Sequence, residues 1–187
     1  MSLKTASPAR PAVVVILLAL LASFLLPSTA SAEPADADAA WTKVCYQGTG
    51  NRWIIDLPNK TDLDFWGDPC VHSRGNQLYA SIYFAWGSVS TPEFGSGHKF
   101  DGFKVGVRLE RRPNGGSTDT PLKATDCNIT DKVNASWFGS YTCKTEIYTG
   151  YNVAYNYSSD GFVNFDVDTD GKTWLGVKEM HGSPFMY

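Results

Sequence analysis

The chain has 187 residues, of which 19 are acidic and 16 are Lys or Arg, so its formal net charge at neutral pH is −3. Domains that bind nucleic acid or anionic membranes carry a basic patch, and this charge balance argues against both kinds of partner. The sequence has no clear catalytic, nucleotide-binding or zinc-binding motif. Function therefore has to be inferred from compartment, fold class and surface residues.

The first 32 residues are typical of an export signal. Lys4 and Arg10 give a basic start, an apolar run with a single serine covers residues 12–26, and the small residues Ala, Ser and Ala occupy positions 30–32. The apolar run is fifteen residues long, whereas a membrane-spanning helix needs about 20. The sequence therefore predicts a secreted, extracellular protein in which residues 1–32 are a cleaved signal peptide.

The rest of the chain is predicted to be one domain behind a short tail. Residues 33–40 are rich in Ala and Asp and have too little apolar surface to join a core, so we expect them to be disordered. Residues 41–187 are long enough to bury a sizeable core as a single domain. Loss of the signal leaves 14 basic against 19 acidic residues. We expect no nucleic-acid partner and no membrane span in the mature chain.

Four cysteines follow the signal: Cys45, Cys70, Cys127 and Cys143. An even number of cysteines in an exported chain predicts disulfides. Of the three possible pairings we favour Cys45–Cys70 with Cys127–Cys143, because each closes a short loop and contributes roughly 3 kcal/mol of stability. The alternative, a zinc site, is not favoured because the spacing lacks a C-x-x-C pair.

Alternation of apolar and polar residues with a period of two predicts strands along most of the chain. In residues 77–86 the apolar side chains fall on one face, and Tyr79 and Tyr83 on the other. Residues 103–111 alternate in the same way, with Phe103, Val105, Val107 and Leu109 inward and Lys104, Arg108 and Glu110 outward. Further strands are predicted at 43–47, 53–57 and 141–149, and no stretch after the signal has a convincing helical pattern. The predicted fold is all-β: a single antiparallel β-sandwich or jelly roll stapled by two disulfides.

The last third of the chain is predicted to be a three-stranded meander, with turns at 158–161 and 169–171. If Gly171 takes the left-handed conformation in a three-residue loop, the second hairpin matches apolar residues with apolar residues. Phe165 then faces Leu175, and Val163 faces Val177. The residues expected to point inward are Val163, Phe165, Val167, Thr173, Leu175 and Val177.

Asp166, Asp168 and Asp170 precede Gly171 with the spacing of calcium ligands. The match fails at the twelfth position, where Val177 stands in place of a bidentate Glu, and strands rather than helices flank the motif. We therefore expect a polar strand face that ends in an Asp-Gly turn, and no cofactor. A surface calcium site at these three aspartates is the alternative.

Aromatic residues are abundant and provide the main candidates for a ligand-binding surface. Tyr151, Tyr155 and Tyr157 share one predicted strand face, and side chains two apart on a strand are about 6.7 Å apart, so they form a flat platform for a sugar or a peptide. The alternative is that this face packs against a second sheet. Phe94 and His98 lie in the long segment 88–102, and a second long segment covers 112–121. We expect the first to insert into a partner, or to fold over one end of the sandwich.

Enzymatic activity is not favoured, although a hydrolase is the alternative. His72, His98 and His181 lie in turn-rich or terminal settings, and no serine lies in a G-x-S-x-G elbow. A glycosidase-like carboxylate pair could come from Glu93, Glu110, Glu146 and Glu179. The predicted function is a secreted binding module for an extracellular carbohydrate or protein. A structural surface protein is the third possibility.

Overall fold

The computed structural model describes residues 40–90, 98–168, 170–172 and 175–187. The predicted signal peptide, residues 1–32, and all but the last residue of the predicted disordered tail, residues 33–40, lie outside the described part. Ten strands and one six-residue helix are present there. The elements are β1 (Thr42–Cys45), β2 (Arg52–Ile55), β3 (Leu63–Arg74), β4 (Gln77–Ser88), β5 (Phe100–Pro113), β6 (Thr120–Asn128), α1 (Thr130–Ala135), β7 (Gly139–Lys144), β8 (Tyr148–Thr149), β9 (Tyr155–Val167) and β10 (Leu175–Glu179).

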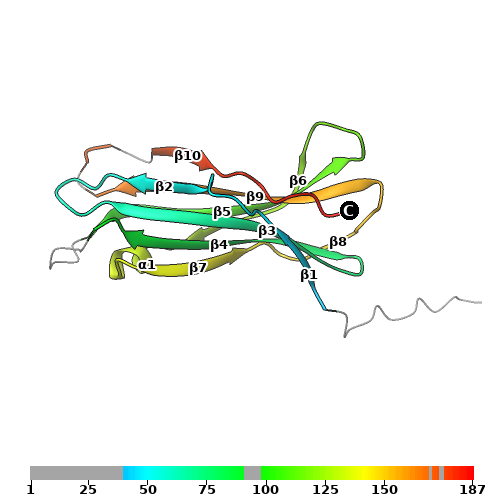
Figure 1. The fold of residues 1–187 in the computed structure, drawn as a ribbon, viewed down its shortest axis with the longest axis horizontal. Helices are drawn as coiled ribbons and strands as arrows, with labels where there is room; N and C mark the ends of the chain where they lie inside the picture. Colours follow the sequence, from blue (N-terminus) through cyan, green and yellow to red (C-terminus); the bar gives the residue numbers. More distant parts are fainter. Residues whose placement is uncertain (1–39, 91–97, 169, 173–174) are drawn as a thin grey trace, which may run out of the picture. The chain divides into compact units, whose positions relative to one another are not determined.

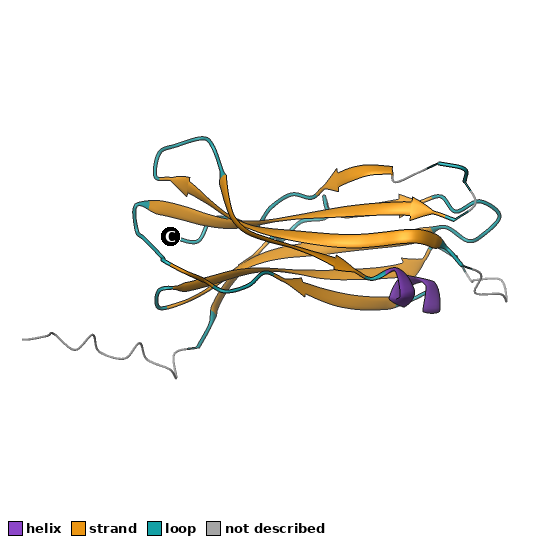
Figure 2. Cartoon of the chain, turned by 180° about the vertical axis from the view of Figure 1, so that it is seen from behind, coloured by secondary structure: helices purple, strands orange, loops and turns teal. Residues whose placement is uncertain are grey.

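The strands form two sheets, and within each sheet every pair of neighbouring strands is antiparallel. A six-stranded sheet has the order β1-β3-β4-β7, with β2 also pairing with β3 and β8 with β4, and a four-stranded sheet has the order β10-β9-β5-β6. Figure 1 shows the long strands β3, β4, β5 and β9 running lengthwise, and Figure 2 shows α1 at one end of them. The predicted antiparallel all-β fold is confirmed. Within the described residues, no helix is long and apolar enough to cross a bilayer.

Aromatic side chains fill the space between the two sheets. Phe65 on β3 and Phe84 on β4 meet Phe103 on β5, with ring centroids 6.2 and 5.6 Å apart. Phe65 also contacts Phe165 on β9 at 6.5 Å. The inward residues predicted for β4 and β5 are all buried. The arrangement is therefore sandwich-like, because alternate side chains of both sheets share one core.

Both predicted disulfides are present: one lies within a sheet, and the other joins the two sheets. Cys45–Cys70 joins directly facing residues of β1 and β3 within the six-stranded sheet, across a sequence separation of 25. Cys127–Cys143 joins β6 of one sheet to β7 of the other, across a separation of 16. The first bond fixes a strand register and the second holds the sheets together.

The turn predicted at 158–161 is wrong, because β9 runs through it without a break. These residues pair with β5 along their length, with Ser158 opposite Glu110 and Gly161 opposite Val107. A Cβ atom on Gly161 would lie 2.7 Å from Ile82 of the other sheet, so the small residue permits close contact between the sheets. Tertiary pairing overrides turn propensity here. Conversely, the strand predicted at 141–149 is divided into β7 and β8.

The β9–β10 hairpin follows the predicted register only at its beginning. Gly171 has φ of +72°, and Leu175 faces Phe165 as predicted. A bulge follows, so that Lys178 rather than Val177 faces Val163, and the prediction is wrong by one residue there. Val163, Phe165 and Val167 are buried as expected. Thr173 and the side chains of Leu175 and Val177 lie outside the described part of the chain.

Candidate functional site

The tyrosine platform predicted around residue 157 is wrong. Tyr157 is fully buried, and its hydroxyl accepts a hydrogen bond from the backbone N–H of Asn152 at 2.9 Å. The ring of Tyr151 stacks on it at 5.4 Å, and Arg111 lies 4.4 Å above the ring of Tyr155. The physical reason is that this run continues into β9, whose inner face is covered by the other sheet. Its aromatic residues therefore serve the core.

An open aromatic surface lies instead on the outer face of the six-stranded sheet. Trp66 on β3 is 38% exposed and Tyr83 on β4 is 45% exposed. Trp66 faces Ala85 and Tyr83 faces Asp68 across the same strand pair, so the two rings are diagonal neighbours on one face. Diagonal neighbours are about 7–8 Å apart, within reach of large side chains. The sequence-based prediction that Tyr83 points away from the core is confirmed.

A second aromatic group on this face is closed rather than open. The imidazole of His72 stacks on Tyr79 at 4.2 Å, and Trp41 meets the edge of Tyr79 at 4.8 Å. Ring nitrogen Nε2 of His72 lies 2.8 Å from the hydroxyl of Ser81. Burial, and then the charges of nearby lysines, lower the pKa of His72 to about 4. His72 is therefore neutral at physiological pH and holds this corner of the sheet together.

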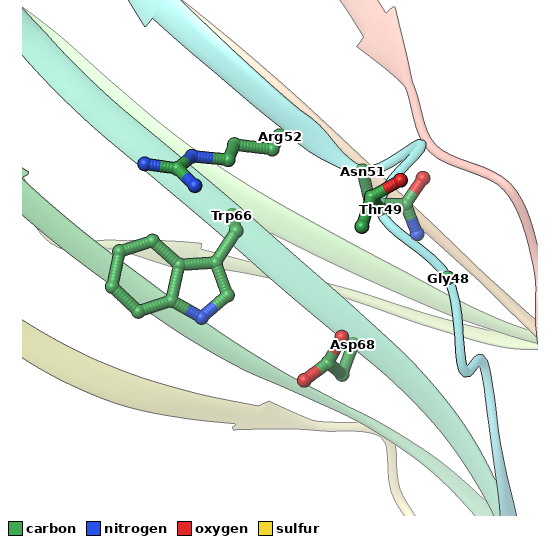
Figure 3. A pocket seen from close by; sticks show the side chains of 6 residues that line it. All are labelled: Gly48, Thr49, Asn51, Arg52, Trp66 and Asp68. Carbon is green, nitrogen blue, oxygen red and sulfur yellow. The ribbon is translucent and has the colours of Figure 1, made fainter.

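A pocket opens beside Trp66 because one edge of β3 has two successive partners. Cys45 of β1 faces Cys70, and Arg52 of β2 faces Trp66. The six residues 46–51 therefore span only the three residues 67–69, and the surplus chain leaves the plane of the sheet. The pocket has a volume of about 300 Å³ and is drawn in Figure 3. It is lined by Gly48, Thr49, Asn51, Arg52, Trp66 and Asp68.

The C-terminal segment holds residues 46–51, the loop that forms this pocket. The side-chain amide of Asn51 donates to the carbonyl of His181 at 2.9 Å and accepts from the N–H of His181 at 2.7 Å. The ring of Tyr46 stacks on the imidazole of His181 at 5.8 Å. Gly67 of β3 donates its N–H to the carbonyl of Asn51. The pocket is thus pre-organised by a two-pronged amide contact.

The two charged groups that line the pocket differ in their partners. The guanidinium of Arg52 binds both carboxylate oxygens of Asp64, with Nε at 3.0 and 2.9 Å. The carboxylate of Asp68 has no hydrogen-bond or ion-pair partner among the described residues. Burial raises the pKa of Asp68, and the charge of Lys43 opposes this only in part. The pocket therefore offers one uncommitted carboxylate beside an indole.

Trp66, Asp68 and Arg52 were not identified from the sequence, although a signal was present. In residues 63–68, Leu63 and Phe65 are buried on one face, and Trp66 is exposed on the other face between Asp64 and Asp68. A tryptophan on the polar face of a strand, flanked by carboxylates, has no core to join. That pattern could have indicated a surface site.

The outer face of the four-stranded sheet carries a network of charges. Arg108 on β5 binds Glu179 of β10 in two-pronged fashion, with nitrogen–oxygen distances of 3.3 and 2.7 Å. The same guanidinium lies 3.3 Å from Glu110 and 3.5 Å from Asp160. Arg112 binds both carboxylate oxygens of Asp119. Sequence reasoning missed Asp160 because it placed that residue in a turn, whereas Asp160 faces Arg108 across β5 and β9.

Glu110 points outward as predicted but is buried by this network rather than solvated. Burial and the neighbouring charge of Asp160 raise its pKa to about 7, although Arg108 opposes the shift. Its acid form donates a hydrogen bond to Asp160. A retaining glycosidase keeps its two carboxyls about 5–5.5 Å apart with a gap for the sugar, and these two groups instead bind each other.

The other acids and histidines named for a hydrolase do not converge on this network. Glu146 is exposed and pairs with Lys123, and Glu93 lies outside the described residues. His72 is stacked on Tyr79, His181 on Tyr46, and His98 contacts Asp101. Among the described residues, these acids and histidines therefore do not come together as an acid–base pair.

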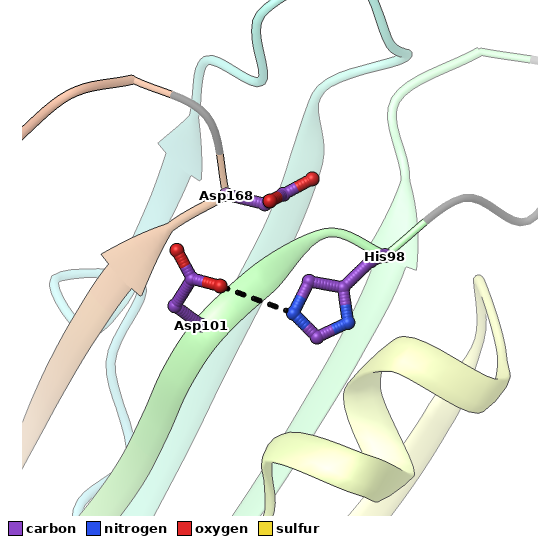
Figure 4. Close-up of side chains that lie close together, drawn as sticks. All are labelled: His98, Asp101 and Asp168. Carbon is purple, nitrogen blue, oxygen red and sulfur yellow. Dashed lines mark hydrogen bonds and ion pairs between the residues drawn. The ribbon is translucent and has the colours of Figure 1, made fainter.

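The three aspartates with calcium-like spacing point in different directions. Asp168 accepts a hydrogen bond from Lys60 at 3.1 Å, and Asp170 accepts one from the backbone N–H of Lys172 at 2.7 Å. Asp166 lies on the outer face of β9, and its Oδ1 is buried with no hydrogen-bond partner among the described residues. Among the described residues, Asp168 instead comes together with His98 and Asp101, with ligand atoms within 4.8 Å of one another (Figure 4).

Hydrogen bonding makes this second group a poor metal site. The side chain of Asn134 is fixed, because its Oδ1 accepts from the N–H groups of Lys99 and Phe100. Its Nδ2 therefore donates to Nδ1 of His98 at 3.2 Å, which leaves the proton of His98 on Nε2, facing Asp101. A neutral imidazole that accepts at Nδ1 has no lone pair at Nε2 for a metal. His98 here is part of a loop anchor. Phe94, the other residue predicted on this loop, lies outside the described residues.

Comparison of the chain with protein-family models, with curated proteins and with solved structures finds no match.

Proposed function

We propose that the chain is a secreted binding module that recognises an extracellular carbohydrate on the outer face of the six-stranded sheet. In this proposal residues 1–32 are the signal peptide, and residues 41–187 form a single β-sandwich domain. The two disulfides and the predicted signal support export. The observation that carries the proposal is the exposure of Trp66 and Tyr83 as neighbours on one open sheet face.

The chemistry of this face suits a sugar. Sugar rings present flat C–H surfaces that stack on aromatic rings, and their hydroxyls need polar partners at the rim. Trp66 and Tyr83 provide the aromatic rings, and Asp68 and Arg52 border the indole. A ligand site typically combines apolar surface with a few convergent polar groups. The same face on a protein-binding module would bury a larger apolar area, and the charged residues here interrupt it.

The first experiment tests export. The full chain is expressed in a secreting host, and the protein in the medium is analysed by intact mass and N-terminal sequencing. The expected product begins at Glu33. A product found only inside the cells, or one that retains residues 1–32, would contradict the export part of the proposal.

The second experiment tests binding on a glycan array with purified wild type, Trp66→Ala and Tyr83→Ala. Each substitution removes a stacking surface, so we expect a loss of about 1 kcal/mol or more, roughly fivefold or more in Kd. Tyr187→Ala is the matched control, because Tyr187 is 84% exposed and lies outside this face. Wild-type binding that survives both aromatic substitutions would show that this face is not the site.

A hydrolase is not favoured, because Glu110 is buried in the Arg108 network and the exposed Glu146 and Glu179 pair with Lys123 and Arg108. An array in which bound glycans are cleaved over time, with loss of cleavage in Glu110→Gln, would restore that alternative. A protein partner is the other alternative. It would be favoured by an array without signal together with Trp66-dependent capture of a defined extracellular protein.

A further inference from the structure

The pocket beside Trp66 has a charge that constrains its ligand. The guanidinium of Arg52 is paired with Asp64 through Nε and one terminal nitrogen, so its positive charge is already balanced by a carboxylate. Asp68 is not committed in this way, and its carboxylate lines the pocket next to the indole (Figure 3). The pocket therefore presents a carboxylate and an aromatic ring without a matching free cation among its lining residues.

A carboxylate beside an indole is complementary to an ammonium group. The ring face attracts a cation through its quadrupole, and the carboxylate forms a charge-assisted hydrogen bond with it. A partly buried carboxylate without a partner is also costly, and an incoming cation offsets that cost. Burial raises the pKa of Asp68, as expected for a partly buried carboxylate that no hydrogen bond or ion pair with the described residues stabilises. Uronic acids and sulfated sugars would bring a second negative charge to the same place and be repelled.

We propose that this pocket takes the protonated amine of an amino sugar in the bound glycan, with Asp68 selecting the amine and Trp66 stacking on the ring. This inference rests on the proposed carbohydrate-binding function and specifies its ligand class. Asp68 is in this view the specificity-determining residue of the site. Asn51 positions the loop that closes the pocket through its two hydrogen bonds to His181.

Two oligosaccharides of equal length distinguish the contribution of the ligand's charge to binding from the contribution of its sugar ring. One is a β-1,4-linked oligomer of glucosamine, and the other is its fully N-acetylated counterpart, in which each amine is a neutral amide. Calorimetry with the purified protein at pH 6 is expected to give about tenfold tighter binding of the glucosamine oligomer, the size of one good charge-assisted contact. Added salt should reduce this preference.

Asp68→Asn keeps the shape of the side chain and removes its charge. It should abolish the preference for the glucosamine oligomer while leaving the affinity for the acetylated oligomer within about twofold. Asp56→Asn is the matched control, because Asp56 is an exposed aspartate that follows β2 and does not line the pocket. Thermal melts of both variants verify that each is folded. Trp66→Ala should weaken binding of both oligomers.

The outcomes distinguish this inference from the proposal on which it rests. Equal affinity for the two oligomers, or a preference that persists in Asp68→Asn, overturns the amino-sugar assignment. If Trp66→Ala still weakens binding in that case, the carbohydrate-binding face stands. Asp68-dependent binding of a lysine peptide without binding of either oligomer overturns both, because the pocket would then recognise a protein.

Discussion

The outer faces of the two sheets use polar and aromatic residues in opposite ways. On the four-stranded sheet, Arg108 is surrounded by three carboxylates, and Glu110 is buried although it points outward. On the six-stranded sheet, Trp66 and Tyr83 are exposed and Asp68 has no partner among the described residues. The charged groups around Arg108 on the first face pair with one another, and this network serves stability. The second leaves its groups available, which is the condition for binding a ligand.

The C-terminal segment connects the two faces. Glu179 binds Arg108, and a Cβ atom on Gly182 would lie 2.0 Å from the carboxylate of Asp160, so the chain runs directly against the charge network. His181, one of the two residues between these contacts, holds Asn51 of the pocket loop. The charge network and the pocket loop therefore contact the same short segment of the chain.

The largest expected effect is on the free energy of unfolding, and it tests the contrast between buried and exposed aromatic residues. Tyr157→Ala should lower the free energy of unfolding by about 3–5 kcal/mol, because it deletes a fully buried ring and leaves a cavity. Denaturant melts measure this loss. Binding by any variant population that remains folded should be unchanged. A stable Tyr157→Ala protein that has lost glycan binding would instead restore Tyr157 as a ligand residue.

Arg108→Ala should cost roughly 3 kcal/mol at pH 8, because it leaves Glu110, Asp160 and Glu179 without their shared cation. The loss should shrink at pH 5, where Glu110, whose pKa is about 7, takes up a proton. Lys123→Ala is the control, since Lys123 pairs with the exposed Glu146 and its removal should cost under about 0.5 kcal/mol. Equal losses for the two variants would show that the Arg108 network is solvated.

Glu110 should make the protein less stable as pH rises. Its pKa of about 7 in the folded state lies above the ordinary value of 4.5, so the folded protein holds a proton that the unfolded chain releases. The stability contributed by the protonated acid is complete below about pH 4.5 and is lost as pH rises through about 7. Glu110→Gln mimics the acid, so melts at pH 8.5 and pH 4 should differ by roughly 2 kcal/mol less than in wild type. An unchanged pH profile would refute the proton-sharing arrangement.

His72 should have the opposite effect on the other face. Its folded-state pKa of about 4 lies below the ordinary 6.5, so its contribution is complete above about pH 6.5 and is lost as pH falls through about 4. His72→Phe keeps the stacking on Tyr79 but cannot titrate. Between pH 7 and pH 4 the variant should lose roughly 2 kcal/mol less stability than wild type. A variant with the same acid sensitivity would place the responsible group elsewhere.

The smallest expected effect is the change in the protein's stability when an aromatic ring of the proposed site is removed. Trp66→Ala and Tyr83→Ala should each change the free energy of unfolding by less than about 1 kcal/mol, because both rings lie on an exposed sheet face and neither belongs to the core. Thermal melts alongside the binding assay provide the measurement. A loss of several kcal/mol for either variant would mean that the ring supports the fold and that the contrast between the two faces does not hold.

Much of the fold follows from local sequence pattern. Alternation in β4 and β5 predicted which side chains are buried, because side-chain direction in a strand depends only on parity. Cysteine number and spacing predicted Cys45–Cys70 and Cys127–Cys143. Gly171 predicted the left-handed position in the last hairpin, because few other residues adopt that conformation at low cost. Each of these predictions needs information from only a few neighbouring residues or from a simple count.

Only the tertiary structure decided which strand faces become surface and which become core. Tyr157 is buried because β9 lies beneath the other sheet, and Asp160 meets Arg108 because β9 pairs with β5 in one register. The pocket exists because β1 and β2 share one edge of β3 and six residues span three. These facts depend on contacts between residues far apart in the chain, and a one-residue change in register would reverse them. The local sequence pattern does not contain this information.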